Sequence, residues 1–172
     1  MNYVISCIDS DKYTVYSDLP GHTAPGGGSI PPHICVTPLK PDIVIIDENT
    51  KICHIFELTV PCFENINIRN QQKSNKYAHF LTDLSGYTGK VTCFEICSRG
   101  YICDRNHSNL KVLHSFVKSS IKLKQFKENI SALSIYSSYH IYLYRNDNSF
   151  IDPPFFNPPL KNSSWKKYCN IK

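Results

Sequence analysis

Two apolar segments joined by a polar turn are the feature that most constrains how this chain folds. Residues 43–46 form an unbroken β-branched run, and residues 51–60 form a second apolar segment that ends before Pro61. An unbroken run of this kind is typical of a strand covered on both faces, and the Asp-Glu-Asn-Thr sequence between the segments is typical of a turn. We therefore expect a β-hairpin over residues 43–60.

Each strand of this hairpin carries an acidic residue. Asp42 stands at the head of the first strand, and Glu57 lies inside the second, within the sequence Ile-Phe-Glu-Leu-Thr-Val. Asp42 could simply end a turn, and Glu57 could be a paired core carboxylate. A buried carboxylate is costly unless it is paired or bound to a metal, however. Two acids on neighbouring strands therefore also fit a site for a hard divalent cation, and the spacing leaves both interpretations open.

Helical spacing follows the hairpin, over residues 64–84. At 100° per residue, one sector of this helix holds both aromatic or apolar side chains and three cations. We expect the three cations to point toward the sheet edge where the carboxylates lie, because a purely structural helix would turn them to the opposite side. The sector contains Ile66, Arg69, Lys73, Lys76, Tyr77, Phe80 and Leu84.

The remaining segments place this hairpin and helix within an α/β domain. We expect strands at residues 3–8, 13–16, 90–97 and 101–103, a Pro- and Gly-rich connection at 19–38, and helices at 110–124 and 126–144. The Tyr-rich end of the last helix also alternates and could form a strand. The fold class expected is α/β, with a small mixed central sheet flanked by helices and additional C-terminal helices.

The chain divides into four parts on this interpretation. Residues 1–38 hold N-terminal strands and the Pro/Gly-rich connection, 39–105 the core, 106–149 the C-terminal helices, and 150–172 a Pro-, Lys- and aromatic-rich tail expected to be flexible.

Composition favours a globular chain in a reducing, intracellular setting. Hydrophobic residues make up 41% of the 172 residues, and the net charge of +5 is compatible with a polyanionic partner. The eight cysteines are spread singly rather than in a disulfide framework. Cys93, Cys97, Cys103 and His107 match no strong zinc template, so we interpret these cysteines as buried thiols. No apolar run approaches the roughly 18 residues of a membrane span, so we expect no membrane association.

Several blocks together resemble a known nuclease family. Pro41-Asp42, then Glu57-Leu58-Thr59, then Lys73 and Lys76-Tyr77 look like the signature of the PD-(D/E)xK, or restriction-endonuclease-like, nucleases. The chain is more closely similar to the restriction-like endonuclease domain of some non-LTR retrotransposon polyproteins. Further blocks of that likeness are Ser-Asp-Leu-Pro-Gly at 17–21, Ser-Arg-Gly-Tyr-Ile at 98–102 and Ser-Ser-Tyr-His-Ile-Tyr-Leu-Tyr-Arg at 137–145. The resemblance covers roughly residues 17–145. It departs from the general pattern at Thr59, which stands where a lysine is expected.

The resemblance implies a restriction-endonuclease-like core and metal-dependent hydrolysis of a DNA phosphodiester. Asp42, Glu57 and a strand carbonyl near Leu58 would hold Mg²⁺ or Mn²⁺. Lys73 or Lys76 would steady the developing charge or help deprotonate a water, and Tyr77 would position the helix or touch the DNA backbone. Three further cations are expected to bind nucleic acid: Arg69, Lys90 and Arg99.

By analogy with that family, the product is a nick whose free 3′-hydroxyl primes reverse transcription. The implied partners are DNA and the reverse transcriptase and RNA of a parent element, and nuclear localisation follows from the DNA substrate. The alternative function is a catalytically inactive nucleic-acid-binding remnant with the same fold. The complete set of two acids and lysines favours the enzyme, because DNA binding alone does not need two acids beside a phosphate.

Overall fold

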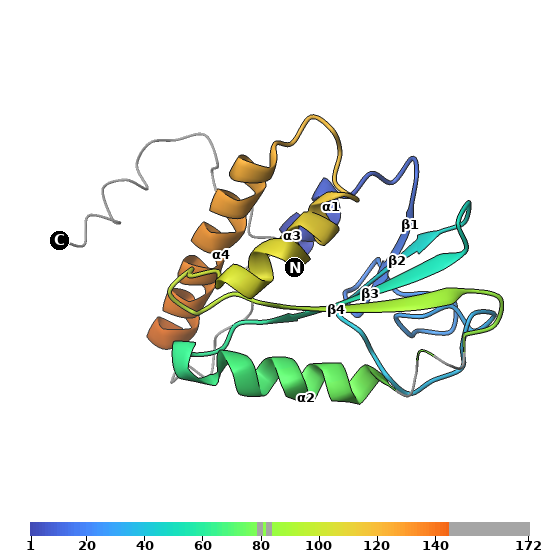
Figure 1. The fold of residues 1–172 in the computed structure, drawn as a ribbon, viewed down its shortest axis with the longest axis horizontal. Helices are drawn as coiled ribbons and strands as arrows, with labels where there is room; N and C mark the ends of the chain where they lie inside the picture. The colour runs from blue at the N-terminus through green and yellow to red at the C-terminus, as the bar shows by residue number, and fades with distance from the viewer. Residues whose placement is uncertain (79–80, 82–83, 145–172) are drawn as a thin grey trace.

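The computed structural model describes residues 1–78, 81 and 84–144, and its elements form three layers. A four-stranded sheet lies between helix α2 on one face and helices α1, α3 and α4 on the other (Figure 1). The expected α/β class, with a small mixed sheet flanked by helices, is confirmed. The elements in chain order are α1 (Asn2–Cys7), β1 (Thr14–Ser17), β2 (Ile43–Asp47), β3 (Ile52–Thr59), the 3-10 turn η1 (Phe63–Asn65), α2 (Ile66–Ala78), β4 (Thr88–Glu95), α3 (Asp104–His114) and α4 (Leu123–Tyr144).

The sheet has the order β1-β2-β3-β4 and mixed strand directions. β1, β2 and β3 pair antiparallel, whereas β4 runs parallel to β3. The parallel pair needs a crossover, which α2 supplies, and the crossover places α2 over one face of the sheet. The hairpin expected at residues 43–60 is confirmed as β2 and β3.

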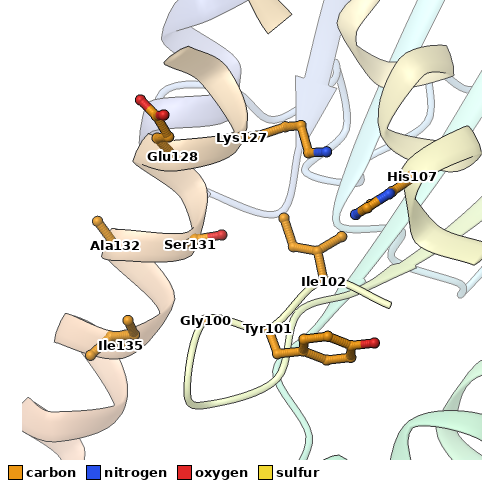
Figure 2. A pocket seen from close by; sticks show the side chains of 9 residues that line it. All are labelled: Gly100, Tyr101, Ile102, His107, Lys127, Glu128, Ser131, Ala132 and Ile135. Atoms are coloured by element: carbon orange, nitrogen blue, oxygen red, sulfur yellow. The ribbon is translucent and has the colours of Figure 1, made fainter. Parts of the chain in front are cut away.

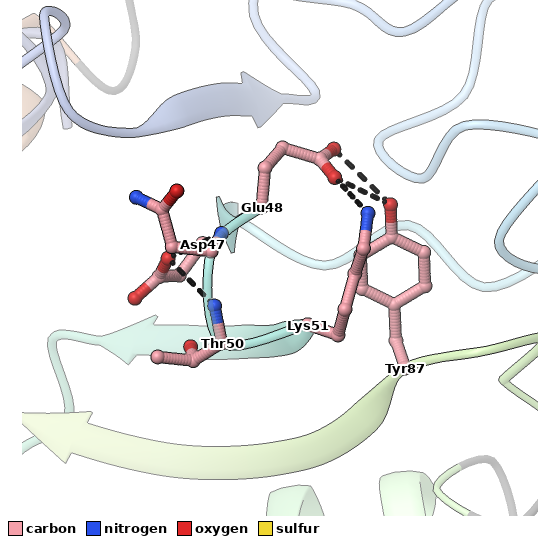
Figure 3. A network of polar contacts seen from close by, with 6 residues as sticks. Asp47, Glu48, Thr50, Lys51 and Tyr87 are labelled. Carbon is pink, nitrogen blue, oxygen red and sulfur yellow. Dashed lines mark hydrogen bonds and ion pairs between the residues drawn. The ribbon is translucent and has the colours of Figure 1, made fainter.

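Local side-chain contacts close the turn of this hairpin (Figure 3). The Asp47 carboxylate accepts hydrogen bonds from the backbone amides of Asn49 and Thr50, at 3.0 and 3.2 Å. Glu48 then contacts the Lys51 ammonium at 2.7 Å and the Tyr87 hydroxyl at 2.9 Å. These contacts bind the turn to the start of β4, at the end of the sheet away from the acids of the hairpin.

β2 lies at the centre of both apolar cores, as its unbroken β-branched sequence predicts. All four residues at 43–46 are at most 1% exposed. Ile43 and Ile45 pack with residues of α1, α3 and α4, whereas Val44 and Ile46 pack with Tyr77 of α2 and with the connection before β2. The alternation fixes which side chains of the hairpin face α2.

The N-terminal strand expected at residues 3–8 is wrong, because this segment lies in α1 as far as Cys7. Its buried residues are Val4, Ile5, Cys7 and Ile8, a helical spacing that strand alternation cannot bury on one face. The strand expected at 13–16 is confirmed as β1.

The boundaries of the later elements also differ from those expected. α2 is shorter than the helix predicted at 64–84, and residues 79, 80, 82 and 83 lie outside the described part, Phe80 among them. β4 begins and ends two residues earlier than expected, and residues 101–103 form no strand. α3 starts at Asp104 and ends at His114, so the helix expected at 110–124 is wrong in both bounds.

The last helix is confirmed as α4, including its Tyr-rich end, and the strand alternative for that end is wrong. The tail expected to be flexible, residues 150–172, lies outside the described residues. No helix within the described ranges combines the length and hydropathy that a bilayer crossing requires.

Candidate functional site

The two acids of the hairpin face each other across neighbouring strands. In the β2–β3 ladder Ile43 pairs with Phe56, so one further step sets Asp42 opposite Glu57. Directly opposite residues of an antiparallel pair project from the same face of a sheet, here the face covered by α2. The backbone amide of Leu58 donates a hydrogen bond to the Asp42 carboxylate at 2.7 Å. The hairpin itself therefore brings these two carboxylates together.

Helix α2 supplies the partners of the Glu57 carboxylate. Glu57 is 1% exposed, and each of its oxygens has a separate donor: the Lys73 ammonium contacts one and the Tyr77 hydroxyl donates to the other. Lys73 and Tyr77 stand four residues apart, which places them on one face of the helix. Tyr77 is fully buried, whereas the Lys73 side chain is 30% exposed. The buried Glu57 charge is thus paired with side chains on the face of α2 that packs on the sheet, and the partly exposed Lys73 connects it to solvent.

The electrostatics of this cluster follow from burial and from the Glu57 charge. Burial raises the pKa of Asp42, and the nearby Glu57 charge raises it further, against the opposing effect of the Leu58 amide. Burial also raises the pKa of Tyr77, and its hydrogen bond to Glu57 adds to the shift. Burial alone would lower the pKa of Lys73, but the hydrogen bond and charge of Glu57 outweigh burial and raise it. The cluster therefore holds Lys73 as an ammonium and Tyr77 as a neutral phenol at neutral pH.

The other two cations expected to face the sheet from α2 form no ion pair with the described carboxylates of the hairpin, although the Lys76 charge acts to lower the pKa of Asp42. Arg69 is exposed and donates to the Gln72 side chain at 3.1 Å, so the expectation that it points toward the sheet is wrong. Lys76 is also exposed, and its ammonium lies 4.8 Å from the centre of the Tyr77 ring. The inward face of α2 runs instead through Ile66, Asn70, Lys73 and Tyr77.

Lys90 and Arg99, the other expected nucleic-acid contacts, lie apart from the carboxylate pair. Lys90 pairs with His54 in the β3–β4 ladder, three positions before Glu57, so strand alternation turns it to the opposite face of the sheet. Arg99 is exposed in the turn that follows β4. The structure thus brings together Asp42, Glu57, Leu58, Lys73 and Tyr77 among the expected site residues.

Sequence reasoning missed a second polar contact between α2 and the sheet. Glu95, the last residue of β4, is 1% exposed, and the Asn70 side-chain amide donates to its carboxylate at 2.8 Å. Between the two glutamates lies Cys93, which pairs with Glu57 in the ladder and accepts a hydrogen bond from the Ser74 hydroxyl at 3.5 Å. The signal for Glu95 was present in the sequence, since it interrupts an apolar strand just as Glu57 does.

The donor set at Asp42 and Glu57 fits a hard divalent cation. Mg²⁺ commonly takes one or two protein carboxylates and completes its shell with waters, and two carboxylates on one sheet face supply that number. The Leu58 backbone, already tied to Asp42, stands at the same place. Within the described residues no group of three or more His, Cys, Asp or Glu side chains is arranged to hold a metal. Cys93 and Cys97 are buried free thiols, as the sequence indicated, whereas Cys103 is only partly buried, so the prediction is wrong for Cys103.

A pocket of about 530 Å³ lies elsewhere, on the layer formed by α3 and α4 (Figure 2). Its walls are the loop at residues 100–102, His107 of α3 and the inner face of α4, including Lys127 and Ile135. None of its lining residues belongs to the carboxylate cluster. Glu128 is the single acid among its lining residues, so the pocket lacks the paired acids that make the carboxylate cluster the stronger candidate for chemistry.

A scan against models of known protein families and a search of curated proteins found no match to this chain.

Proposed function

We propose that this chain is a metal-dependent DNA endonuclease with a restriction-endonuclease-like core of retrotransposon origin. One observation carries the proposal: Asp42, directly before β2, lies opposite Glu57 of β3, and Lys73 of the following helix contacts Glu57. The order acid, acid, lysine along the sequence thus coincides with a cluster in space. A structural ion pair would need only one of the two acids.

In this proposal Asp42, Glu57 and the Leu58 carbonyl would hold Mg²⁺ or Mn²⁺. A cation of this kind supplies charge stabilisation at a phosphate and lowers the pKa of a bound water. The partner is DNA, joined in the parent element by its reverse transcriptase and RNA, and the place of action is the nucleus.

The chain's own residues bind and orient the substrate. Lys73, with part of its side chain open to solvent, stabilises negative charge on the phosphate that is cleaved. Lys76 is exposed, with its ammonium 4.8 Å from the centre of the Tyr77 ring, and would contact the DNA backbone. Tyr77 fixes the Glu57 carboxylate by its hydrogen bond, so it acts as a positioning residue. Hydrolysis leaves a nick with a free 3′-hydroxyl.

The test is nicking of supercoiled plasmid with Mg²⁺ or Mn²⁺, for the wild type, Asp42→Asn, Glu57→Gln and Lys73→Ala. The matched control is Glu64→Gln, because Glu64 is an exposed acid one turn before α2. We expect each of the three site variants to lose at least about a hundredfold in rate, since each removes a charge used in the transition state. EDTA should abolish nicking, and the control should keep the wild-type rate.

The second candidate is a DNA-binding remnant without turnover, which one observation favours. Both Glu57 oxygens are engaged by Lys73 and Tyr77, so this charge is satisfied within the chain itself. If folded protein retains DNA in a gel shift but shows no metal-dependent nicking, the remnant replaces the endonuclease.

A further inference from the structure

The carboxylate of Glu95 is satisfied on one side only. Its Oε1 accepts the hydrogen bond from Asn70, but its Oε2 is buried and has no hydrogen-bond partner among the described residues. Burying a carboxylate oxygen without a hydrogen-bond donor destabilises the folded protein. The charge of Glu95 therefore needs a nearby cation to stabilise it.

The nearest cation to this oxygen is Arg105, in the first turn of α3. Its Nη2 lies 3.7 Å from Oε2, which is within ion-pair range but too long for a hydrogen bond. The Arg105 side chain is 45% exposed, whereas that of Glu95 is 1% exposed. If Arg105 served only to neutralise Glu95, a close and buried contact would be expected. Instead this ion pair is long, and almost half of the Arg105 side chain is open to solvent, so its guanidinium can reach a second anion.

Two asparagine side chains of α3 hold this helix, and with it Arg105, at the edge of the sheet. The Asn106 side chain donates to the Glu95 carbonyl at 2.6 Å, and that of Asn109 donates to the Cys93 carbonyl at 2.7 Å. These two bonds attach α3 along the outer edge of β4. Arg105 therefore stands beside the same end of β4 as Glu95, next to Asn70 of α2.

This position is one strand away from the Asp42 and Glu57 pair. Glu57 pairs with Cys93, so Glu95 lies one strand across and two residues along. With strands about 4.8 Å apart and a rise of about 3.3 Å per residue, the two glutamate Cα atoms are separated by about 8 Å. The phosphates of one DNA strand follow each other about every 3.4 Å of helix axis, so a cation beside Glu95 would meet a phosphate close to the one that is cleaved at Glu57.

We propose that Arg105, held at the sheet edge by the Glu95 carboxylate, binds a backbone phosphate of DNA beside the carboxylate pair. The inference rests on the proposed function, because it assigns the nucleic-acid contact of that same site. Arginine suits the task, since its planar fork matches phosphate oxygens while one edge remains on the carboxylate.

The test measures binding of a fluorescein-labelled DNA duplex by anisotropy, with Ca²⁺ in place of Mg²⁺ and with EDTA, over a series of salt concentrations. The variants are Arg105→Ala and Arg105→Gln, the second of which removes the charge but keeps a polar side chain with an amide donor. The matched control is Lys111→Ala, which removes one exposed cation from α3 six residues later. Far-UV circular dichroism establishes that each variant is folded.

We expect both Arg105 variants to lose about tenfold in affinity at moderate salt, and the slope of log K against log salt to fall in magnitude by about 0.9, one phosphate contact. Lys111→Ala should change neither quantity. Equal DNA affinity and equal salt slope for Arg105→Gln and Lys111→Ala would overturn the inference. In that case, plasmid nicking by the wild type would show that the endonuclease proposal survives. Arg105-dependent binding without any metal-dependent nicking would support the inference and overturn the endonuclease.

Discussion

Glu57 is a carboxylate in the interior of the protein, and its charge depends on two side chains of α2. Taking a carboxylate out of water costs several kcal/mol, which the Lys73 ion pair and the Tyr77 hydrogen bond offset. Because the charge is 1% exposed, loss of either partner leaves an oxygen that water cannot easily reach. The stability of this layer is therefore coupled to the same residues that form the candidate site.

Tyr77→Phe should lower the free energy of unfolding by about 1–3 kcal/mol, because it removes the donor to a buried carboxylate oxygen and little volume. The control is Tyr87→Phe, which also removes a tyrosine hydroxyl that donates to a glutamate, but at the exposed hairpin turn. Urea unfolding monitored by circular dichroism measures both. A loss no larger for Tyr77→Phe than for Tyr87→Phe would mean that the hydroxyl does not stabilise Glu57.

The sequence predicted the residues of this cluster only in part, because it did not show which side chains of α2 face the sheet. Asp42, Glu57 and Lys73 could be found because acids inside apolar strands are unusual and because the lysine shares a helix sector with Tyr77. The inward face of α2 runs through Asn70 rather than Arg69, since the Glu95 carboxylate selects Asn70 as its partner. A helical wheel drawn without knowledge of Glu95 cannot make that choice.

The loop after β4 packs closely against α4 at a single residue, Gly100. Gly100 has a φ of +78°, and a Cβ atom there would lie 2.8 Å from the Ile135 side chain and 2.9 Å from the Ser131 carbonyl oxygen. Two constraints thus act on one residue: a left-handed backbone and close approach to a helix. This contact also forms one wall of the pocket in Figure 2.

Gly100→Ala should destabilise the protein by about 2–4 kcal/mol, the sum of the left-handed backbone penalty and the overlap with α4. Gly86→Ala is the matched control, because Gly86 has a φ of +73° and open space around it. It should cost only about 1–2 kcal/mol. Thermal unfolding of the two variants isolates the contact with α4, and equal losses would contradict the close approach.

Elements were predicted well where pattern and tertiary structure agree, and poorly where they conflict. The hairpin was predictable because β-branched runs and turn residues point to one structure. α1 was not, since residues 3–8 are short and apolar, and their burial in the core shared with the sheet, α3 and α4 favours the helix. The start of α3 depends on Asn106, whose side chain bonds the end of β4, a contact between segments that local propensity does not reveal.

The whole molecule has two apolar cores on opposite faces of one sheet, and a partly buried histidine packs against aromatic residues of one of them. His54 packs against Phe116 at a ring-centre distance of 4.6 Å and against Phe56 at 6.3 Å. Burial lowers the pKa of His54 from 6.5 to about 4, and the Lys90 charge contributes to the shift. The unfolded chain therefore binds a proton at a pH where the folded protein does not.

The free energy of unfolding should consequently fall as the pH is lowered from 6.5 to about 4, the window set by the unfolded and folded pKa values of His54. Chemical denaturation at a series of pH values measures the slope. His54→Gln should flatten the slope in this window, whereas His22→Gln, at an exposed histidine, should leave it unchanged. An identical pH dependence for wild type and His54→Gln would exclude His54 as its source.

The ion pair between Lys73 and Glu57 makes the lysine a resident counter-ion. Any cation that binds at Glu57 meets a carboxylate whose charge is already matched, so the two cations compete for one site. The observed affinity for the incoming cation is its intrinsic affinity reduced by the free energy of the pair that it displaces. The contact between Lys73 and Glu57 holds α2 on the sheet. It also means that an incoming cation must exceed a threshold concentration before it displaces the Lys73 ammonium from Glu57.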